Sequence, residues 1–405
     1  MNFQHSPMVL ELCERLRAFM TEHVYPLESA WFEHGRSEAR WEPLPWMEDL
    51  KRKAREAGLW NLWRPKSNGG ILTNLEYAPL CEIMGRVHWA MEVFNCSSPD
   101  TGNMDLILKF GLPEHQTRWA QPLLEGSIRS AFLMTEPDQA SSDATNIQCR
   151  VERDGNDYVL NGRKCWAAGA GDSRCKVLVV MGKSDPDHPD RHKQHSILLV
   201  PSDTPGVRVT RPLPVFGYED PPQGASEVEL TNVRVPQEAL LLGPGRGFEI
   251  AQNRLGPGRL HHCMRLVGKA ERAIEAMCDR AMARTTFGKP LSQRTVTLER
   301  IAESRIAVDA ARWMVLHAAW KLDVGGNKEA RKEIAMIKVM AANTACKVID
   351  WAIQVHGSYG LSNDFALAHA YGYARTQRIA DGPDEIHRNQ IGKLELDARA
   401  KSQQK

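Results

Sequence analysis

The spacing of apolar residues changes twice along the chain and divides it into three zones. Up to about residue 130, apolar residues recur at helical three- and four-residue steps, as in MVLELCERLRAFM and LEYAPLCEIMGRV, with Pro and Gly between them. From about 131 to 236 the period falls to two, and after Gly247 the helical period returns and stays. We therefore predict a chain that is α, then β, then α, with domains at 1–130, 131–240 and 241–405.

The middle zone consists of short β-rich runs separated by turn residues. DYVLNGRKCW follows an Asp154-Gly155 turn signal, and KVLVVMG, HSILLVP, GVRVTRPL and SEVELTNVRVP come after it. These runs predict a β-domain, closed as a barrel or packed as a sandwich. The polar segment SDPDHPDRHKQH is expected to be a loop between two strands.

Two apolar stripes dominate the last zone. They consist of Leu298, Ile301, Val308, Ala311, Val315, Ala318 and Leu322, and of Ile334, Ile337, Ala341, Ala345, Val348, Ala352 and Val355. Gly325-Gly326-Asn327 separates the stripes, so we expect two antiparallel helices in a bundle.

Composition narrows the possible classes of protein. The 405 residues, 42% hydrophobic and 25% charged, are typical of a globular chain with a large core. A formal net charge of +2 gives no electrostatic argument for nucleic acid, and no apolar run reaches the length of a membrane span. The first 20 residues resemble an amphipathic helix rather than a signal peptide. Nine scattered cysteines without a C-x-x-C pair favour free thiols in a reducing compartment, so we expect a cytoplasmic protein.

Familiar nucleotide and hydrolase signatures are absent. GPGRGF at Gly243 lacks the G-x-G-x-x-G spacing of a βαβ unit and is better explained as a flexible link. No G-x-S-x-G elbow occurs.

No metal site is predicted. His261, His262 and Cys263 are adjacent, so on a helix they point in different directions. His188, His192 and His195 could meet within their polar loop, but a solvated loop is the favoured interpretation.

Three segments carry more chemical information. AFLMTEPDQASSDA (131–144) runs from a strand into small residues that expose backbone N–H groups and hydroxyls. In NGRKCWAAGAGD, Trp166 precedes small residues, which indicates an aromatic wall beside something planar, although alone it would favour core packing. In ARTTFGKPL (283–291), Arg284 has the guanidinium fork that matches phosphate oxygens, although alone it would favour a surface arginine.

The stretch ADGPDEIH (380–387) places three carboxylates where Gly and Pro should break a helix. Helix caps are one explanation of these acids, and for Asp384 we prefer it. A catalytic base is the other, and for Asp381 we prefer that.

Six ordered motifs resemble the acyl-CoA dehydrogenases over nearly the whole chain. They are MTEPDQASSD, LNGRKCWAAGAGD, GFEIAQNRLGPGR, RTTFGKPL, IQVHGSYG and ADGPDEIH. The resemblance is closest to the branch of acyl-CoA dehydrogenase family members 10 and 11. Animal members of that branch carry an additional kinase-like domain, for which 405 residues leave no room.

The resemblance implies an α+β multidomain fold, with an N-terminal α-helical domain, a middle β-barrel domain and a C-terminal four-helix bundle. It also implies a homotetramer, with FAD lodged between the β-domain and the C-terminal helices and reached by a neighbouring subunit. FAD binding of this kind needs no G-x-G-x-x-G fingerprint.

Matched residue by residue, the resemblance implies a set of binding positions. The flavin ring would meet backbone groups of Phe132, Met134 and Thr135 and the Trp166 side chain. Ser142 would lie near the pyrophosphate or the pantetheine of CoA. The remaining FAD contacts would be Arg284 and Phe287 from a neighbouring subunit, then Gln354, Gly357, Ser358 and Glu385. Arg259 would lie near the mouth of the active site, with Gly382 against the thioester.

Three positions depart from the family pattern. Ala168 stands where Thr or Ser usually contacts flavin N5, so a hydroxyl is lost while the backbone N–H remains. Thr295 replaces a Gln, and Ser358 replaces a Gly.

The resemblance implies that Asp381 matches the Glu of the family's Glu-Gly-Thr motif and is the general base. A carboxylate whose pKa is raised by desolvation suits removal of the α-proton while hydride passes to flavin N5. RLGPGR offers no carboxylate as an alternative base. We therefore expect oxidation of a saturated acyl-CoA to trans-2-enoyl-CoA, with electrons passed to an electron-transfer flavoprotein. A flavin oxidase of the same fold, resembling nitroalkane or acyl-CoA oxidases, and a flavin-bound nucleic-acid-binding relative remain alternatives.

Overall fold

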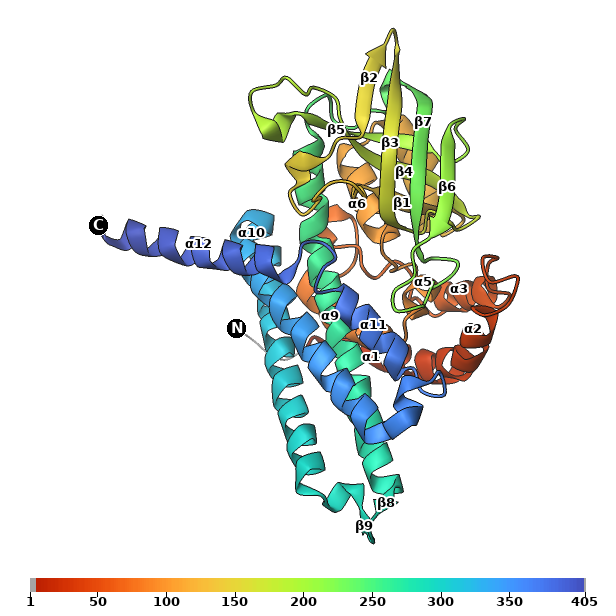
Figure 1. The fold of residues 1–405 in the computed structure, drawn as a ribbon, viewed down its shortest axis with the longest axis vertical. Coiled ribbons are helices and arrows are strands. Elements are labelled where there is room, and N and C mark those ends of the chain that lie inside the picture. Colours follow the sequence, from red (N-terminus) through yellow and green to blue (C-terminus); the bar gives the residue numbers. More distant parts are fainter. Residues whose placement is uncertain (1–4, 404–405) are drawn as a thin grey trace. The chain divides into compact units, whose positions relative to one another are not determined.

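The computed structural model describes residues 5–403, which form two compact units (Figure 1). The helical unit contains the chain up to Glu28, then Ala54–Glu92, then the chain from Arg259 onward. The sheet unit contains Ser29–Lys53 and Val93–Gly258.

The sheet unit is built on one seven-stranded sheet, in which β5 pairs with β4 and the other strands follow the order β1-β4-β2-β3-β7-β6. Its strands are β1 (Arg129–Leu133), β2 (Arg150–Asp154), β3 (Asp157–Ala168), β4 (Cys175–Lys183), β5 (His195–Pro201), β6 (Val207–Pro212) and β7 (Ala225–Pro236). All the predicted β-runs are confirmed as strands. The Asp154-Gly155 signal is a true hairpin turn, because β2 and β3 pair antiparallel around it.

Alternation explains why these runs form strands. Along β7, buried and partly exposed residues alternate from Ala225 to Leu230, so apolar side chains such as Val228 and Leu230 enter the core. Helices α2 (Glu28–His34), α3 (Met47–Glu56), α5 (Ala90–Val93), α6 (Asp100–Phe110), α7 (Pro113–His115) and α8 (Gln121–Glu125) lie wholly or partly in this unit. Among them, α6 packs against β1.

The helical unit contains α1 (Pro7–Phe19), α4 (Asn74–Gly85), α10 (Thr295–His356), α11 (Leu367–Thr376) and α12 (Asp384–Gln403), and most of α9 (Gly247–Ala283). At Gly326, φ is +69° and ψ is −175°, which breaks α10 into two helices. Figure 1 shows that these two helices run antiparallel, as predicted. A short hairpin, β8 (Thr285–Thr286) and β9 (Lys289–Pro290), connects α9 to α10.

Ion pairs reinforce the apolar core of the helical unit. Arg312 of α10 lies 2.8 Å from Glu82 of α4 and 2.7 Å from Glu271 of α9. Arg305 lies 2.6 Å from the same Glu271. Hydrogen bonds from Arg305 and Arg312 outweigh burial and lower the pKa of Glu271 to about 2. This cluster therefore stays charged over the physiological range and ties three helices together.

Each helix in the described part of the chain is too short or too polar to span a bilayer.

Candidate active site

The turn between α11 and α12 carries Asp381, and its backbone is unusual. Asp381 has φ +56° and Gly382 has φ +103°, a left-handed region that Asp tolerates better than most residues and Gly tolerates freely. A Cβ added at Gly382 would lie 2.9 Å from Nε2 of His387. Glycine is therefore required here both by the backbone and by the close approach of His387.

Two cationic side chains fix the main chain of this turn. The Lys338 ammonium donates to the carbonyls of Gln377 and Ala380, at 2.6 and 2.8 Å. The Arg259 Nε donates to the Asp381 carbonyl at 2.8 Å. Because three carbonyls of one short segment are held, the position of Asp381 is set by the bundle rather than by the turn alone.

The Asp381 carboxylate remains accessible, with 23% of the side chain exposed in the single chain. Its Oδ2 lies 3.6 Å from Nε2 of His262 on α9. The other ring nitrogen of His262, Nδ1, lies 3.2 Å from the Tyr373 hydroxyl on α11. The site thus holds a carboxylate, an imidazole and a phenol in sequence.

The two following acids have different environments. Asp384 is buried, accepts from Asn343 Nδ2 at 3.0 Å and from Arg378 Nε at 2.9 Å, and lies in the first turn of α12. Its role is structural, as we preferred from the sequence. Glu385, in the same turn, is exposed.

Burial controls the charge of the groups around the turn. It lowers the pKa of His387 to about 4, with Arg259 and Lys338 adding to the effect, so this imidazole is neutral at pH 7. Burial also lowers the pKa of Lys338, while the Asp381 carboxylate opposes that change. Cationic groups and a neutral imidazole therefore lie around the Asp381 carboxylate.

In the sheet unit, the positions expected to meet a flavin ring lie at the ends of two strands. Cys165 N donates to the Thr135 carbonyl at 2.9 Å, which places Trp166 beside the segment after β1. Trp166 has φ +56° and is 50% exposed, where the register between β3 and β7 shifts. A large half-exposed aromatic next to backbone groups fits a planar ligand better than core packing.

A buried ion pair supports the same segment. Lys164 donates to Glu136 at 2.9 Å and to the carbonyls of Met134 and Met181 at 3.0 and 2.7 Å. Glu136 in turn accepts from the backbone N–H groups of Gln148 and Cys149. The loop that carries Ser142 is thus anchored at its start, while Ser142 itself is exposed.

In the helical unit, the other expected FAD-binding residues are exposed. Phe287, in the β8–β9 hairpin, is fully exposed, and Arg284 just before the hairpin is also exposed. Gln354, Gly357 and Ser358 are exposed at the end of α10, where Arg280 donates to the His356 carbonyl at 3.3 Å. Figure 1 places the hairpin and the start of α12 at opposite ends of this unit. One chain therefore does not bring Arg284 and Phe287 together with Glu385.

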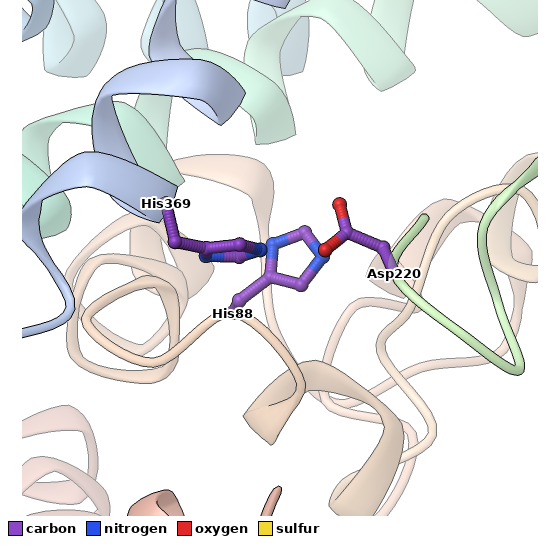
Figure 2. A group of neighbouring side chains, drawn as sticks. All are labelled: His88, Asp220 and His369. Atoms are coloured by element: carbon purple, nitrogen blue, oxygen red, sulfur yellow. The ribbon is translucent and has the colours of Figure 1, made fainter. Parts of the chain in front are cut away.

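The histidines give no metal site that we propose. His88 and His369 of the helical unit cross edge to face, with ring centroids 4.7 Å apart (Figure 2). Asp220, also drawn there, belongs to the sheet unit. His195 begins strand β5 and is buried against the Ile147 carbonyl at 3.0 Å, whereas His192, in the polar loop before it, is exposed.

Sequence reasoning missed four residues around Asp381: His262, Tyr373, Lys338 and His387. Two of them left a signal. His262 follows Arg259 by three positions, which puts both on one helical face. Lys338 stands among the apolar positions of its stripe, four residues after Ile334 and three before Ala341. No pattern in the sequence pointed to Tyr373, and His387, although it ends the ADGPDEIH stretch, was given no role there.

Family models match three consecutive parts of the chain. They describe the acyl-CoA dehydrogenase N-terminal domain at residues 7–127, the middle domain at 131–233 and the C-terminal domain at 245–396. A solved structure from Mycobacterium abscessus, named as a candidate acyl-CoA dehydrogenase, is 49% identical with a TM-score of 0.95, covering 98% of this chain and 100% of that one. Butyryl-CoA dehydrogenase from Megasphaera elsdenii, 23% identical with a TM-score of 0.82 over 98% of this chain and 100% of its own, shows the same fold.

Curated relatives agree with the predicted branch. Mouse acyl-CoA dehydrogenase family member 10 is 53% identical over 98% of this chain, which spans 38% of the mouse protein. Probable acyl-CoA dehydrogenase FadE2 of Mycobacterium tuberculosis is 50% identical over 99% of this chain and 98% of its own length. The predicted fold, an N-terminal helical part, a middle curled sheet and a C-terminal helical part, is confirmed. The chain belongs to the acyl-CoA dehydrogenase family.

Proposed function

We propose that the protein is an FAD-dependent acyl-CoA dehydrogenase that converts a saturated acyl-CoA to trans-2-enoyl-CoA, with Asp381 as the general base. The observation that carries this proposal is the turn at 380–382. It presents one accessible carboxylate on a main chain held by Lys338 and Arg259. Family membership supplies the reaction class, and the turn supplies the group that the reaction needs.

Asp381 would accept the proton from the α-carbon of the acyl-CoA. An ionised carboxylate is the form that accepts a proton, and the nearby cations Arg259 and Lys338 favour that form. Gly382 lets the backbone approach the thioester, whose carbonyl must accept hydrogen bonds for the α-proton to become acidic. FAD, when bound, supplies the acceptor for the hydride that leaves the β-carbon.

Residues of both units would hold FAD. In the sheet unit, Phe132, Met134, Thr135, Ala168 and Trp166 would serve the ring, and Ser142 would serve the diphosphate or the CoA. In the helical unit, Arg284, Phe287, Gln354, Gly357, Ser358 and Glu385 would serve the rest of the dinucleotide. The exposed aromatic faces of Trp166 and Phe287 support this assignment, because large aromatics left in water commonly mark binding surfaces.

Self-association would complete the site. Leu298, Ile306 and Trp313 are exposed on α10 at steps of eight and seven residues, so they share one helical face. Together with the exposed Phe287, this stripe supports a homotetramer in which a neighbour contributes Arg284 and Phe287. An electron-transfer flavoprotein would accept the electrons. Nine free cysteines support a reducing compartment such as the cytoplasm.

The test compares the wild-type protein with Asp381→Asn in anaerobic titrations with saturated acyl-CoAs. We expect the wild-type flavin spectrum to bleach with one chain class, and the variant to bind FAD but reduce it at least about a thousandfold more slowly. Undiminished reduction by Asp381→Asn would exclude Asp381 as the base. Rapid reoxidation by oxygen with peroxide release would instead indicate an oxidase. A flavoprotein that no acyl-CoA reduces but that binds DNA with strong salt dependence would indicate a binding protein.

A further inference from the structure

His262 lies next to the Asp381 carboxylate, and Tyr373 lies next to His262 on its other side. Arg259 and His262, three residues apart on α9, approach the same residue from one helical face: Arg259 holds its carbonyl, and His262 lies 3.6 Å from its carboxylate. The main chain and the side chain of Asp381 are thus controlled separately. Arg259 and Lys338 fix the backbone, and His262 is the group placed to fix the carboxylate.

Tyr373 determines how the His262 ring is used. Burial raises the pKa of Tyr373, so its hydroxyl stays protonated and can donate to His262 Nδ1, 3.2 Å away. The phenol is itself held, with the Lys269 ammonium 4.8 Å from its ring centroid and the His88 ring centroid 5.1 Å away. In the tautomer in which Nδ1 accepts from Tyr373, a neutral ring carries its proton on Nε2, which faces Asp381.

We propose that His262, oriented by the Tyr373 hydroxyl, is a positioning residue that holds the Asp381 carboxylate ionised and aimed at the substrate. This proposal rests on the assignment of Asp381 as the base. The His262 Nε2–H donates toward the carboxylate, and the α-proton passes from carbon to Asp381. His262 keeps its own proton throughout. The distance of 3.6 Å is just beyond a direct hydrogen bond, and such contacts commonly shorten when substrate binds.

Other titratable or charged groups also face Asp381. A change in the pH profile of a variant is assigned to His262 only when these groups remain in place. They are Arg259 and Cys263 on α9, Lys338 on α10, Tyr373 on α11 and His387 on α12. Arg265 on α9 in turn faces the Tyr373 hydroxyl. Hydrogen bonding to an ionised carboxylate lowers its pKa. Loss of the His262 donor should therefore move the acid limb of the rate profile to higher pH while the other groups stay unchanged.

The chain provides a matched control one residue away. His261 is also buried on α9, but its ring meets Tyr77, with centroids 5.0 Å apart, instead of Asp381. Burial lowers the pKa of His261 to about 3, so it is neutral at pH 7, and His261→Gln changes a neutral ring for a neutral amide. It reports the general cost of replacing a buried histidine on this helix.

The experiment measures the limiting rate of flavin reduction by a saturated acyl-CoA, as a function of pH, in the full holoenzyme. We expect a loss of about 10- to 100-fold for His262→Phe, less for His262→Gln, and about 3- to 10-fold for Tyr373→Phe. In His262→Phe/Tyr373→Phe the loss should equal that of His262→Phe alone, because Tyr373 acts through His262. Ionisation of a bound 3-oxoacyl-CoA, read from its enolate absorbance, tests the same proton transfer without flavin reduction.

Each outcome separates this proposal from the assignment of the base. If Asp381→Asn abolishes reduction while His262→Gln and Tyr373→Phe match the wild-type rate and pH profile, the base stands and this proposal is overturned. If His261→Gln slows reduction as much as His262→Gln does, the effect is general destabilisation and the proposal is also overturned. Tyr373→Phe removes one oxygen atom, so the test remains decisive even if His262→Phe does not fold.

Discussion

Two of the buried lysines, Lys164 in the sheet unit and Lys338 in the helical unit, perform related tasks with different chemistry. Lys164 in the sheet unit is 0% exposed and meets the Glu136 carboxylate and two carbonyls. Lys338 in the helical unit is 2% exposed, and the hydrogen bonds found for its ammonium go to two carbonyls. Each lysine anchors a segment to which we assign function: the loop after β1, or the turn that carries Asp381.

The difference lies in where the positive charge is neutralised. Lys164 is neutralised by direct contact with Glu136, so that pair fixes the loop and leaves little field around it. Lys338 fixes the turn through carbonyls, and its charge acts on Asp381 nearby. A buried cation can therefore anchor a backbone alone, or anchor it and also favour the ionised form of a neighbouring base.

The largest effect is expected when the buried Lys164–Glu136 ion pair is broken. Lys164→Met leaves the Glu136 carboxylate buried without its cation, which should lower the free energy of unfolding by about 3–5 kcal/mol. Chemical denaturation checks this value, and FAD affinity should fall because the loop after β1 is released. In Lys164→Met/Glu136→Gln part of the stability should return. If the single variant lost less than about 1 kcal/mol, Lys164 would not be the group that neutralises the buried Glu136 carboxylate.

The next largest effect is expected when Lys338 no longer holds the carbonyls of the turn. Lys338→Met leaves the Gln377 and Ala380 carbonyls without their donor, which should cost about 2–3 kcal/mol of unfolding free energy. FAD should be retained, but flavin reduction at saturating acyl-CoA should slow by about tenfold or more, since Asp381 loses both its support and a nearby cation. Stopped-flow reduction of the FAD-loaded variant measures this. Equal loss of FAD in both lysine variants would remove the distinction between the two anchors.

The free energy of unfolding, measured as pH is lowered, tests the environment of His387 beside the turn. The folded-state pKa of His387 is about 4, below the ordinary value of 6.5, so the unfolded chain binds the extra proton between these values. Stability is therefore full above pH 6.5 and falls as pH drops toward 4, by roughly 3 kcal/mol from this residue. His387→Gln should flatten that part of the stability curve. His261 has the same sign, with a pKa of about 3, and His261→Gln separates its share.

The smallest effect serves as the control for the sheet unit. Arg163, next to Lys164, forms an exposed pair with Asp138 at 3.0 Å. Exposed pairs contribute little, so Arg163→Met should change the free energy of unfolding by less than about 0.5 kcal/mol. A change as large as that of Lys164→Met would show that burial does not distinguish the two cations.

The spacing of apolar residues predicted most of the helices and strands, because burying one face of an element makes apolar residues recur at its period. The strands and the break at Gly326 were found where alternation and glycine indicated. The pairing of strands could not be read, since β1 lies parallel to β4, and β5 joins the sheet through β4, only after distant segments meet. Leu298 belongs to the predicted stripe but is exposed, because a helical stripe can extend beyond the core it packs on. The domain boundaries at 130 and 240 stay predictions.

The site was partly predictable for a similar reason. Asp381-Gly382-Pro383 shows a broken helix in the sequence itself, so the turn and its acid were visible. Arg259 meets Asp381 across 122 positions, and no local pattern encodes that contact. Lys338 was overlooked because a lysine within an apolar stripe usually keeps its charge in water, whereas here carbonyls of the turn replace the water. The roles of all the site residues stay predictions until they are tested.

The break at Gly326 has a consequence for the chain's tolerance of insertions. Residues 323–326 are exposed and a Cβ added at Gly326 would meet no atom within 4 Å, while the helices on either side are held by buried residues such as Leu322 and Ile334. Lengthening such a connection costs only the slowly growing entropy of closing a longer loop. A fluorescent reporter or an affinity tag could therefore be grafted at this tip, leaving Asp381 and its supporting residues in their native sequence.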